Sequence, residues 1–206
     1  MNKEVKTEQN QSKTDTPLKQ LSDLLMPKGA FYSGYFLKGI DKVVSPDEMR
    51  PALGHAWFKN GFLYATNSHI AVKINLDFLS IEEDDQHLFE GKSFNREALK
   101  ELSKITKDTM WYISDFGITI HNTKVILFSN EEHNFPDIDA VIPKEQTPID
   151  SISVKSEYVK VVEAIYKNLG GEKQALIMEF YGTNKAVKLI GNYSEKFEAI
   201  IMPVTF

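Results

Sequence analysis

The chain has 206 residues, of which 42% are hydrophobic and 26% charged, the composition of a globular protein with a hydrophobic core. It contains no cysteine, which excludes disulfides and thiolate metal sites and makes a reducing cytoplasm the expected compartment. No apolar run has the length of a membrane span, so no membrane contact is expected, and the net charge of −5 means that the position of basic residues matters more than their total.

Residues 1–30 are predicted to form a polar tail. Lys, Glu, Gln, Asn, Ser and Thr fill its first half and offer too little apolar surface to offset the entropy of an ordered chain. A short apolar cluster from Leu21 to Met26 interrupts the tail and ends at Pro27. We expect this cluster to become helical only against a partner surface.

Three later segments share one pattern, which indicates an internal repeat. Each begins with an apolar residue followed by Lys, at Leu37, Leu99 and Val159, and places further apolar residues three and six positions later. This spacing gives a short amphipathic helix with the lysine off its apolar face. Three polar residues precede these helices as candidate caps: Ser33, Asn95 and Ser156.

Strand patterns surround each predicted helix. Residues 31–32, 93–94 and 152–154 precede the helices, and alternating apolar segments follow them, the first pair (53–58 and 62–74) joined by the hairpin signal Asn60-Gly61. The unit is strand–helix–strand–strand–strand, repeated three times, with helices on one face of antiparallel sheets, an α+β architecture. We place two units in a domain over 31–143 and the third unit over 149–206.

Basic residues recur on the predicted helices. In the second helix Arg96, Lys100, Lys104 and Lys107 are spaced to form one stripe, whose ordinary explanation is the solvated face of an amphipathic helix. Recurrence in three units favours instead a face that contacts phosphates without reading sequence. The candidate DNA contacts are Lys38, Lys42, Arg96, Lys100, Lys104, Lys107, Lys160 and Lys167.

Three motifs resemble one family, the bacterial DNA polymerase III sliding clamp, or beta subunit. Residues 50–53 (Arg-Pro-Ala-Leu) and 63–72 (Leu-Tyr-Ala-Thr-Asn-Ser-His-Ile-Ala-Val) resemble its Arg-Pro-x-Leu and Ala-Thr-Asp-Gly-His-Arg-Leu-Ala. Residues 135–143 resemble its Phe-Pro-Asp-Tyr-Arg-Arg-Val-Leu-Pro, and residues 199–206 resemble its terminal Val-Met-Pro-Met-Arg-Leu. The chain thus resembles the family's middle domain plus the second half of its last domain.

This resemblance implies a DNA-clamp fold and a non-catalytic role in replication. In the family, basic helices line a ring around double-stranded DNA and tether a DNA polymerase, with no cofactor. Roughly a dozen helices close that ring, so three helices per chain imply a homo-oligomer of about four copies, and a monomer or dimer without a ring is the alternative. A second function, from a different class, is a protein-interaction adaptor that keeps the fold and the peptide pocket but does not encircle DNA.

The resemblance also implies a pocket for a partner's short Gln-Leu-x-Leu-Phe-like peptide. Apolar walls with a few polar groups suit such an anchor, although Ile200 to Val204 could equally be a core strand. Residues 20–25 (Gln-Leu-Ser-Asp-Leu-Leu) themselves resemble the partner peptide. The matching pocket positions are Thr66, His69, Pro136, Val141, Ile200, Met202, Pro203, Val204 and Phe206.

Sequence motifs for catalysis are absent. The five histidines form no ligand pattern with regular spacing, and there is no phosphate-binding loop and no nucleophile elbow, so we expect neither an enzyme nor a metal site. Glu131, Glu132 and His133 could bind a metal, which would suit a small hydrolase, but a solvated turn is their ordinary explanation.

Overall fold

The structure of the protein is a computed structural model that describes residues 29–33, 37–79, 81, 83–106, 109–120, 124–131, 133–145, 147–149, 151–171, 175–191 and 196–204. Most of the predicted tail, including its segment 20–25, lies outside these residues, as do Lys107 and Phe206. None of the described helices is both long enough and apolar enough to cross a lipid bilayer.

The first of two antiparallel sheets has four strands in the order β1-β6-β7-β8. Its strands β6, β7 and β8 are consecutive in the chain and joined as hairpins. β1 adds to the free edge of β6, with Phe31 opposite Trp111. The bounds are β1 (Gly29–Ser33), β6 (Thr109–Ile113), β7 (Gly117–Ile120) and β8 (Lys124–Leu127).

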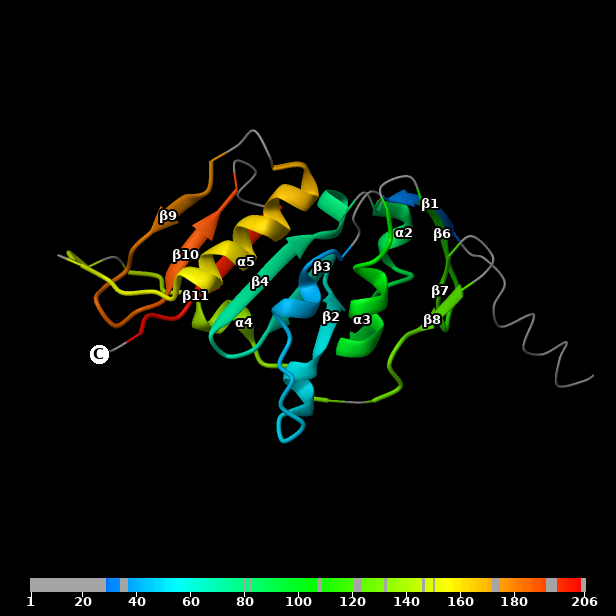
Figure 1. Ribbon diagram of the computed structural model, residues 1–206, viewed down its shortest axis with the longest axis horizontal. Helices are drawn as coiled ribbons and strands as arrows, with labels where there is room; N and C mark the ends of the chain where they lie inside the picture. Colours follow the sequence, from blue (N-terminus) through cyan, green and yellow to red (C-terminus); the bar gives the residue numbers. More distant parts are fainter. Residues whose placement is uncertain are drawn as a thin grey trace, which may run out of the picture.

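The second sheet has seven strands in the order β5-β2-β3-β4-β11-β10-β9. Its centre is the pairing of β4 with β11, where Ile74 lies opposite Phe197 and Ile70 opposite Ile201. This pairing joins the strands of the first and third predicted units into one continuous sheet, to which β5 of the second unit adds at one edge (Figure 1). The bounds are β5 (Ser93–Asn95), β2 (His55–Lys59), β3 (Phe62–Thr66), β4 (Ile70–Asn75), β11 (Phe197–Ile201), β10 (Val187–Ile190) and β9 (Ile177–Glu179).

The first two units exchange their opening strands. β1, which opens the first unit, pairs with β6 of the second, and β5, which opens the second unit, pairs with β2 of the first. The expected opening strand of the third unit, residues 152–154, is not a strand. Instead, Ser153 O accepts a backbone hydrogen bond from Val204 N (2.8 Å), and Ile152 and Val154 pack against the hydrophobic core.

The helical segments are shorter than the sequence pattern predicts. The first is only a 3₁₀ turn, because Leu37 (φ 60°) and Gly39 (φ 89°) have left-handed backbone that cannot continue an α-helix. The second ends at Leu102, and the third continues into a wider turn that Gly170 (φ 91°) ends. The bounds are η1 (Ile40–Lys42), η2 (Pro51–Gly54), η3 (Leu76–Leu79), α2 (Glu83–Gln86), α3 (Arg96–Leu102), α4 (Ile138–Val141), α5 (Ser156–Tyr166) and η4 (Lys167–Gly171).

Of the three predicted caps, only Asn95 caps a described helix. Asn95 caps α3 as predicted, because its side chain accepts a hydrogen bond from Ala98 N (2.9 Å). Ser156 does not cap α5, since it is the first helical residue and Lys155 holds the cap position without a side-chain bond. Ser33 ends β1 and is not adjacent to a described helix.

The repeated apolar positions build the core, which confirms the amphipathic pattern. At the first two predicted helices all six expected inward residues are buried, although Leu37, Val43 and Ile105 lie outside the observed bounds of η1 and α3. In α5 Val162 and Ile165 are buried, while Val159 is half-buried. Tyr166 packs against Phe197 of β11, with ring centroids 5.1 Å apart. Its ring also fills the space beside Gly191, where a Cβ atom would lie 2.4 Å from it. The helices therefore lie on one face of antiparallel sheets, as expected. The division into domains over 31–143 and 149–206 stays a prediction.

Candidate functional site

The three helical segments lie side by side on one face of the molecule (Figure 1). η1 lies in the middle and contacts α3. On its other side, Asn168, just after α5, donates a hydrogen bond to Lys38 O (3.4 Å), and Ile165 lies against Gly39. The repeat pattern therefore does bring the three lysine-bearing segments onto one surface.

The predicted DNA contacts differ in how they are presented on this surface. Lys42, Lys104, Lys160 and Lys167 are exposed, and Lys38, Arg96 and Lys100 are half-buried. Arg96 is partly withdrawn, because its Nε atom is buried without a hydrogen-bond partner among the described residues. Lys104 and Lys167 lie just beyond the ends of α3 and α5.

Glutamates neutralise much of the basic stripe on α3. Lys100 Nζ lies 3.4 Å from Glu97 Oε1, and Lys104 Nζ lies 2.5 Å from Glu101 Oε1. Lys124 of β8 also binds Glu101. These hydrogen bonds, first that of Lys104 and then that of Lys124, lower the pKa of Glu101 to about 2.

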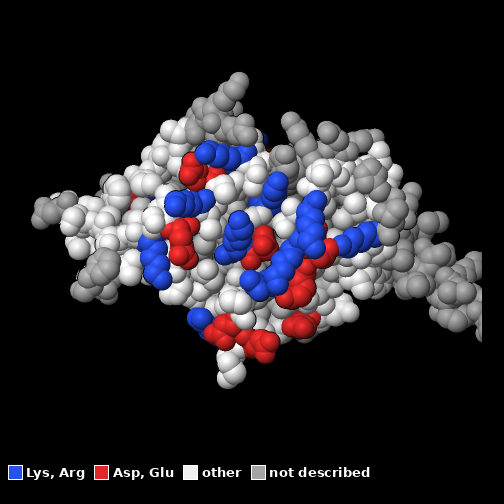
Figure 2. Space-filling model, viewed as in Figure 1, with Lys and Arg blue, Asp and Glu red and all other residues white. Residues whose placement is uncertain are grey.

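The helix face is therefore of mixed charge. Within their observed bounds, η1, α3 and α5 carry four basic and five acidic side chains, because the short helices leave out several of the predicted cations. Figure 2, in the same view, shows Lys and Arg side chains interspersed with Asp and Glu across this face. Phosphates would have to compete with these carboxylates for the lysines.

A pocket of about 730 Å³ lies beside the junction of β4 and β11. Its walls come from the turn between β3 and β4, from α4 with its flanking residues, from the loop before β10, and from the end of β11. Six of the nine predicted pocket residues line it: Thr66, His69, Pro136, Val141, Ile200 and Met202. Pro203 and Val204 continue past it, half-buried.

The helix α4, which forms one wall of the pocket, is held in place by two aspartates. Asp137 caps it by accepting a hydrogen bond from Ala140 N (3.1 Å). Asp139 lies 2.7 Å from Lys73 Nζ and accepts a 3.3 Å hydrogen bond from the Tyr64 hydroxyl. Burial is the largest single effect and opposes the charge on Lys73, but the hydrogen bond to Asp139 and the attraction of Tyr64, Asp139 and Glu198 together raise the pKa of Lys73. Burial is the largest effect on Tyr64 and raises its pKa.

The turn that leads into β4 forms the opposite wall. Thr66 Oγ1 donates to Ile70 O (2.8 Å) and accepts from Ser68 N (3.1 Å), while Asn67 Oδ1 accepts from His69 N (3.0 Å). Ser68 has a φ of 76°, where the resembled motif has glycine. The ring of His69 stacks on Tyr158 of α5 at 5.8 Å, which connects the pocket to the helix face.

Sequence reasoning missed part of the pocket. Asn184, Lys185 and Ala186 line it from the loop before β10, and Leu53 lines it from η2. The 184–186 loop carries no motif, and only the β4–β11 pairing brings it to the turn at residues 66–70. By contrast, Leu53 is part of a quoted motif, so its proximity to the pocket could have been expected.

Comparison with known proteins was negative by sequence, because no protein-family model and no curated protein matches this chain. Solved structures do match. A DNA polymerase III subunit beta from Borrelia burgdorferi, in complex with a natural product, matches with a TM-score of 0.61 and 14% identity over 86% of this chain and 64% of its own. The chain has the DNA-clamp fold.

Two further clamps match in the same way. The DNA polymerase III subunit beta of Bartonella birtlesii, bound to griselimycin, gives a TM-score of 0.57 and 12% identity over 88% of this chain and 67% of its own. The Helicobacter pylori beta clamp bound to a DNA ligase peptide gives a TM-score of 0.52 and 14% identity over 88% of this chain and 67% of its own. This chain therefore spans about two thirds of the length of each clamp that it resembles, and the expected resemblance is confirmed at the level of the clamp fold.

Proposed function

We propose that the protein is a non-catalytic, clamp-like replication factor that contacts duplex DNA through its helix face and holds a partner peptide in its pocket. The observation that carries the proposal is the pocket at the β4–β11 junction, where three separately predicted motifs meet in a molecule with the clamp fold. The Helicobacter pylori clamp bound to a DNA ligase peptide supports the peptide part of the proposal.

The chemistry of the pocket suits a short apolar peptide. Ile138, Ile200 and Met202 provide apolar surface, while Thr66, Ser68 and Asn184 provide a few polar groups at its edge. Burying one leucine or phenylalanine side chain there would contribute about 1.5–3 kcal/mol. A peptide of the Gln-Leu-x-Leu-Phe kind offers two such anchors.

Fluorescence anisotropy of a labelled Gln-Leu-x-Leu-Phe peptide tests this directly with the full chain. Met202→Glu and Val141→Glu put a charge on exposed positions of the pocket wall (40% and 55% exposed), so they should weaken binding about tenfold or more without unfolding the protein. Met49→Glu, at an exposed residue outside the pocket (88% exposed), is the matched control and should bind normally. Equal affinity in all four proteins would overturn the pocket assignment.

DNA contact is tested by the dependence of affinity on salt. Lys100→Glu with Lys104→Glu reverses two charges on the helix face and should abolish binding to duplex DNA at moderate salt. Lys59→Glu with Lys144→Glu changes the net charge equally at exposed positions away from the helices and should bind nearly as the wild type. If both pairs lost affinity alike, the contact would depend on net charge and not on this face.

The second candidate function is a protein-interaction adaptor without DNA encirclement. The ion pairs that bind Lys100 and Lys104 to glutamates favour it, because they leave the helices with no excess of positive charge. Peptide binding of normal affinity, together with no salt-sensitive affinity for duplex DNA, would establish the adaptor over the clamp.

A further inference from the structure

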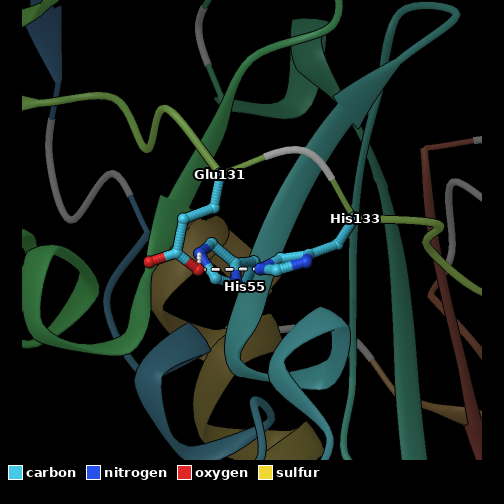
Figure 3. Close-up of side chains that lie close together, drawn as sticks. All are labelled: His55, Glu131 and His133. Carbon is cyan, nitrogen blue, oxygen red and sulfur yellow. Dashed lines mark hydrogen bonds and ion pairs between the residues drawn. The ribbon is translucent and has the colours of Figure 1, made fainter.

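Three side chains that could bind a metal meet beside β2, away from the pocket and the helix face. His55 is the first residue of β2 and is buried (4% exposed), while Glu131 and His133 come from the segment that follows β8 (Figure 3). Glu131 Oε2 lies 2.7 Å from His133 Nε2 and 3.8 Å from His55 Nε2. All three candidate ligand atoms lie within 4.8 Å of one another. Glu132 lies outside the described residues.

The backbone fixes which nitrogen of His55 is available. Its Nδ1 atom lies 2.9 Å from Pro51 O, and a carbonyl oxygen can only accept, so Nδ1 must carry the proton. In the neutral ring the lone pair is therefore on Nε2, which faces Glu131 and lies 3.1 Å from the Ser129 hydroxyl. A metal-binding histidine usually donates its second N–H to a carbonyl or carboxylate in this way.

The spacing is close to that of a tetrahedral metal site. With metal–ligand bonds of about 2.0–2.1 Å, ligand atoms lie about 3.3 Å apart, between the two distances that Glu131 makes. The two imidazole nitrogens lie within 4.8 Å of each other, so reaching the tetrahedral spacing takes a movement of at most about 1.5 Å. Glu131 is exposed and His133 is half-buried, so both side chains can make this movement while buried His55 stays in place. A bound cation would replace the hydrogen bond between His133 Nε2 and Glu131 Oε2.

We propose that His55, Glu131 and His133 bind one divalent transition ion of the zinc class, with water as the fourth ligand. Two imidazole nitrogens and one carboxylate oxygen suit such an ion better than Mg²⁺ or Ca²⁺, which prefer oxygen ligands alone. The chain has no cysteine that would compete for it. Sequence spacing could not reveal the site, because His55 lies in a different repeat unit from the other two residues.

The ion would hold the segment between β8 and α4 against β2. Among the described residues from 128 to 137, none is in a helix or strand. Phe128 N and Ser129 N donate backbone hydrogen bonds to Phe116 O and Ser93 O (both 2.8 Å), and the segment beyond them contacts the sheet through side chains. Phe135 packs against Trp57 (6.0 Å) and Tyr64 (6.4 Å), and Pro136 then enters the pocket wall. A metal bound at His133 therefore fixes the approach to α4 only a few residues before the pocket.

Zinc titration of the full-length, untagged protein after chelator treatment tests the proposal. Calorimetry should show one zinc ion bound per chain, and saturating zinc should raise the melting temperature by a few degrees. His133→Ala and Glu131→Gln, at residues that are not part of the buried core, should each weaken zinc binding at least tenfold. His87→Ala, which removes an exposed histidine outside the cluster, should bind zinc as the wild type does.

Two results would overturn the proposal. One is the absence of stoichiometric zinc uptake by the folded wild-type protein. The other is equal zinc affinity in the His133→Ala, Glu131→Gln and His87→Ala proteins, which would place the ion elsewhere. If the cluster is only a hydrogen-bonded ion pair, His133→Ala will lower the melting temperature by the same amount with and without zinc.

Discussion

Ser68 is held in a backbone conformation that L-amino acids disfavour. Its φ of 76° is in the left-handed region, which costs a residue with a Cβ atom roughly 1–2 kcal/mol. The neighbouring hydrogen bonds of Thr66 and Asn67 fix the turn, and Arg50 Nη1 donates to the Ser68 hydroxyl at 3.1 Å on the exposed surface. The turn therefore stores strain at the edge of the pocket.

We expect Ser68→Gly to raise the free energy of unfolding by about 1 kcal/mol, because glycine relieves this strain and the exposed bond to Arg50 contributes little. Urea denaturation measures the change. Ser68→Ala is the control: it removes the hydroxyl but keeps the Cβ atom, so it should not stabilise the protein. If Gly and Ala gave the same result, backbone strain would not be the cause.

At the scale of elements, Glu101 joins α3 to the four-stranded sheet, because it binds both Lys104 and Lys124 of β8. Its pKa is about 2 in the folded protein and near 4.5 when unfolded, so folding favours its ionised form. This contribution is present in full above about pH 4.5 and is lost as the pH falls toward 2.

Glu101→Gln should therefore lower stability at pH 7, and its difference from the wild type should shrink steadily from pH 4.5 downward. Denaturant titrations at a series of pH values measure both proteins. Glu48→Gln, at an exposed glutamate of the loop before η2, is the control for loss of one carboxylate. A Glu101→Gln deficit that stayed constant between pH 5 and pH 3 would contradict the ion-pair explanation.

Local sequence patterns predicted one hairpin turn and one helix cap correctly, but they did not predict how the strands and helices contact one another. Asn60 and Gly61, with φ of 52° and 75°, form the hairpin that the sequence indicates, and Asn95 caps α3, because both effects act within a few residues. The prediction of a first α-helix was wrong for a local reason. Leu37 and Gly39 have left-handed backbone, which the spacing of apolar residues does not reveal. There the apolar spacing predicted burial correctly but not helical geometry.

Strand pairing between distant parts of the chain determines which residues come together in the two sites. The pocket motifs at residues 66–71 and 200–202 come together because β4 pairs with β11, which the resemblance suggested but no spacing could show. His55 meets Glu131 and His133 for the same kind of reason. The charge of the helix face also depended on exact helix ends, since Lys104 and Lys167 fall just outside them.

At the scale of the whole molecule, the two sheets end in exposed strands at opposite ends of the protein (Figure 1). β9 is the edge of the seven-stranded sheet and exposes Ile177 (52%), and β8 is an edge of the four-stranded sheet and exposes Leu127 (58%). Unpaired edges with apolar side chains favour pairing with another chain. Because the two edges differ, pairing β9 of one copy with β8 of the next would be head-to-tail and could close a ring.

The proposed ring predicts a specific pattern of native masses. Four copies of the 23.5 kDa chain would give about 94 kDa. Leu127→Lys and Ile177→Lys each damage one edge, so each variant alone should be monomeric. Mixing them should restore one intact edge-to-edge contact and give a heterodimer of about 47 kDa, because each variant keeps the edge that the other has lost. Native mass spectrometry of the four samples (the wild type, each variant and their mixture) separates the alternatives. A wild-type monomer at high concentration excludes the self-assembled ring, and a loss of assembly in only one variant indicates a symmetric contact through that edge alone.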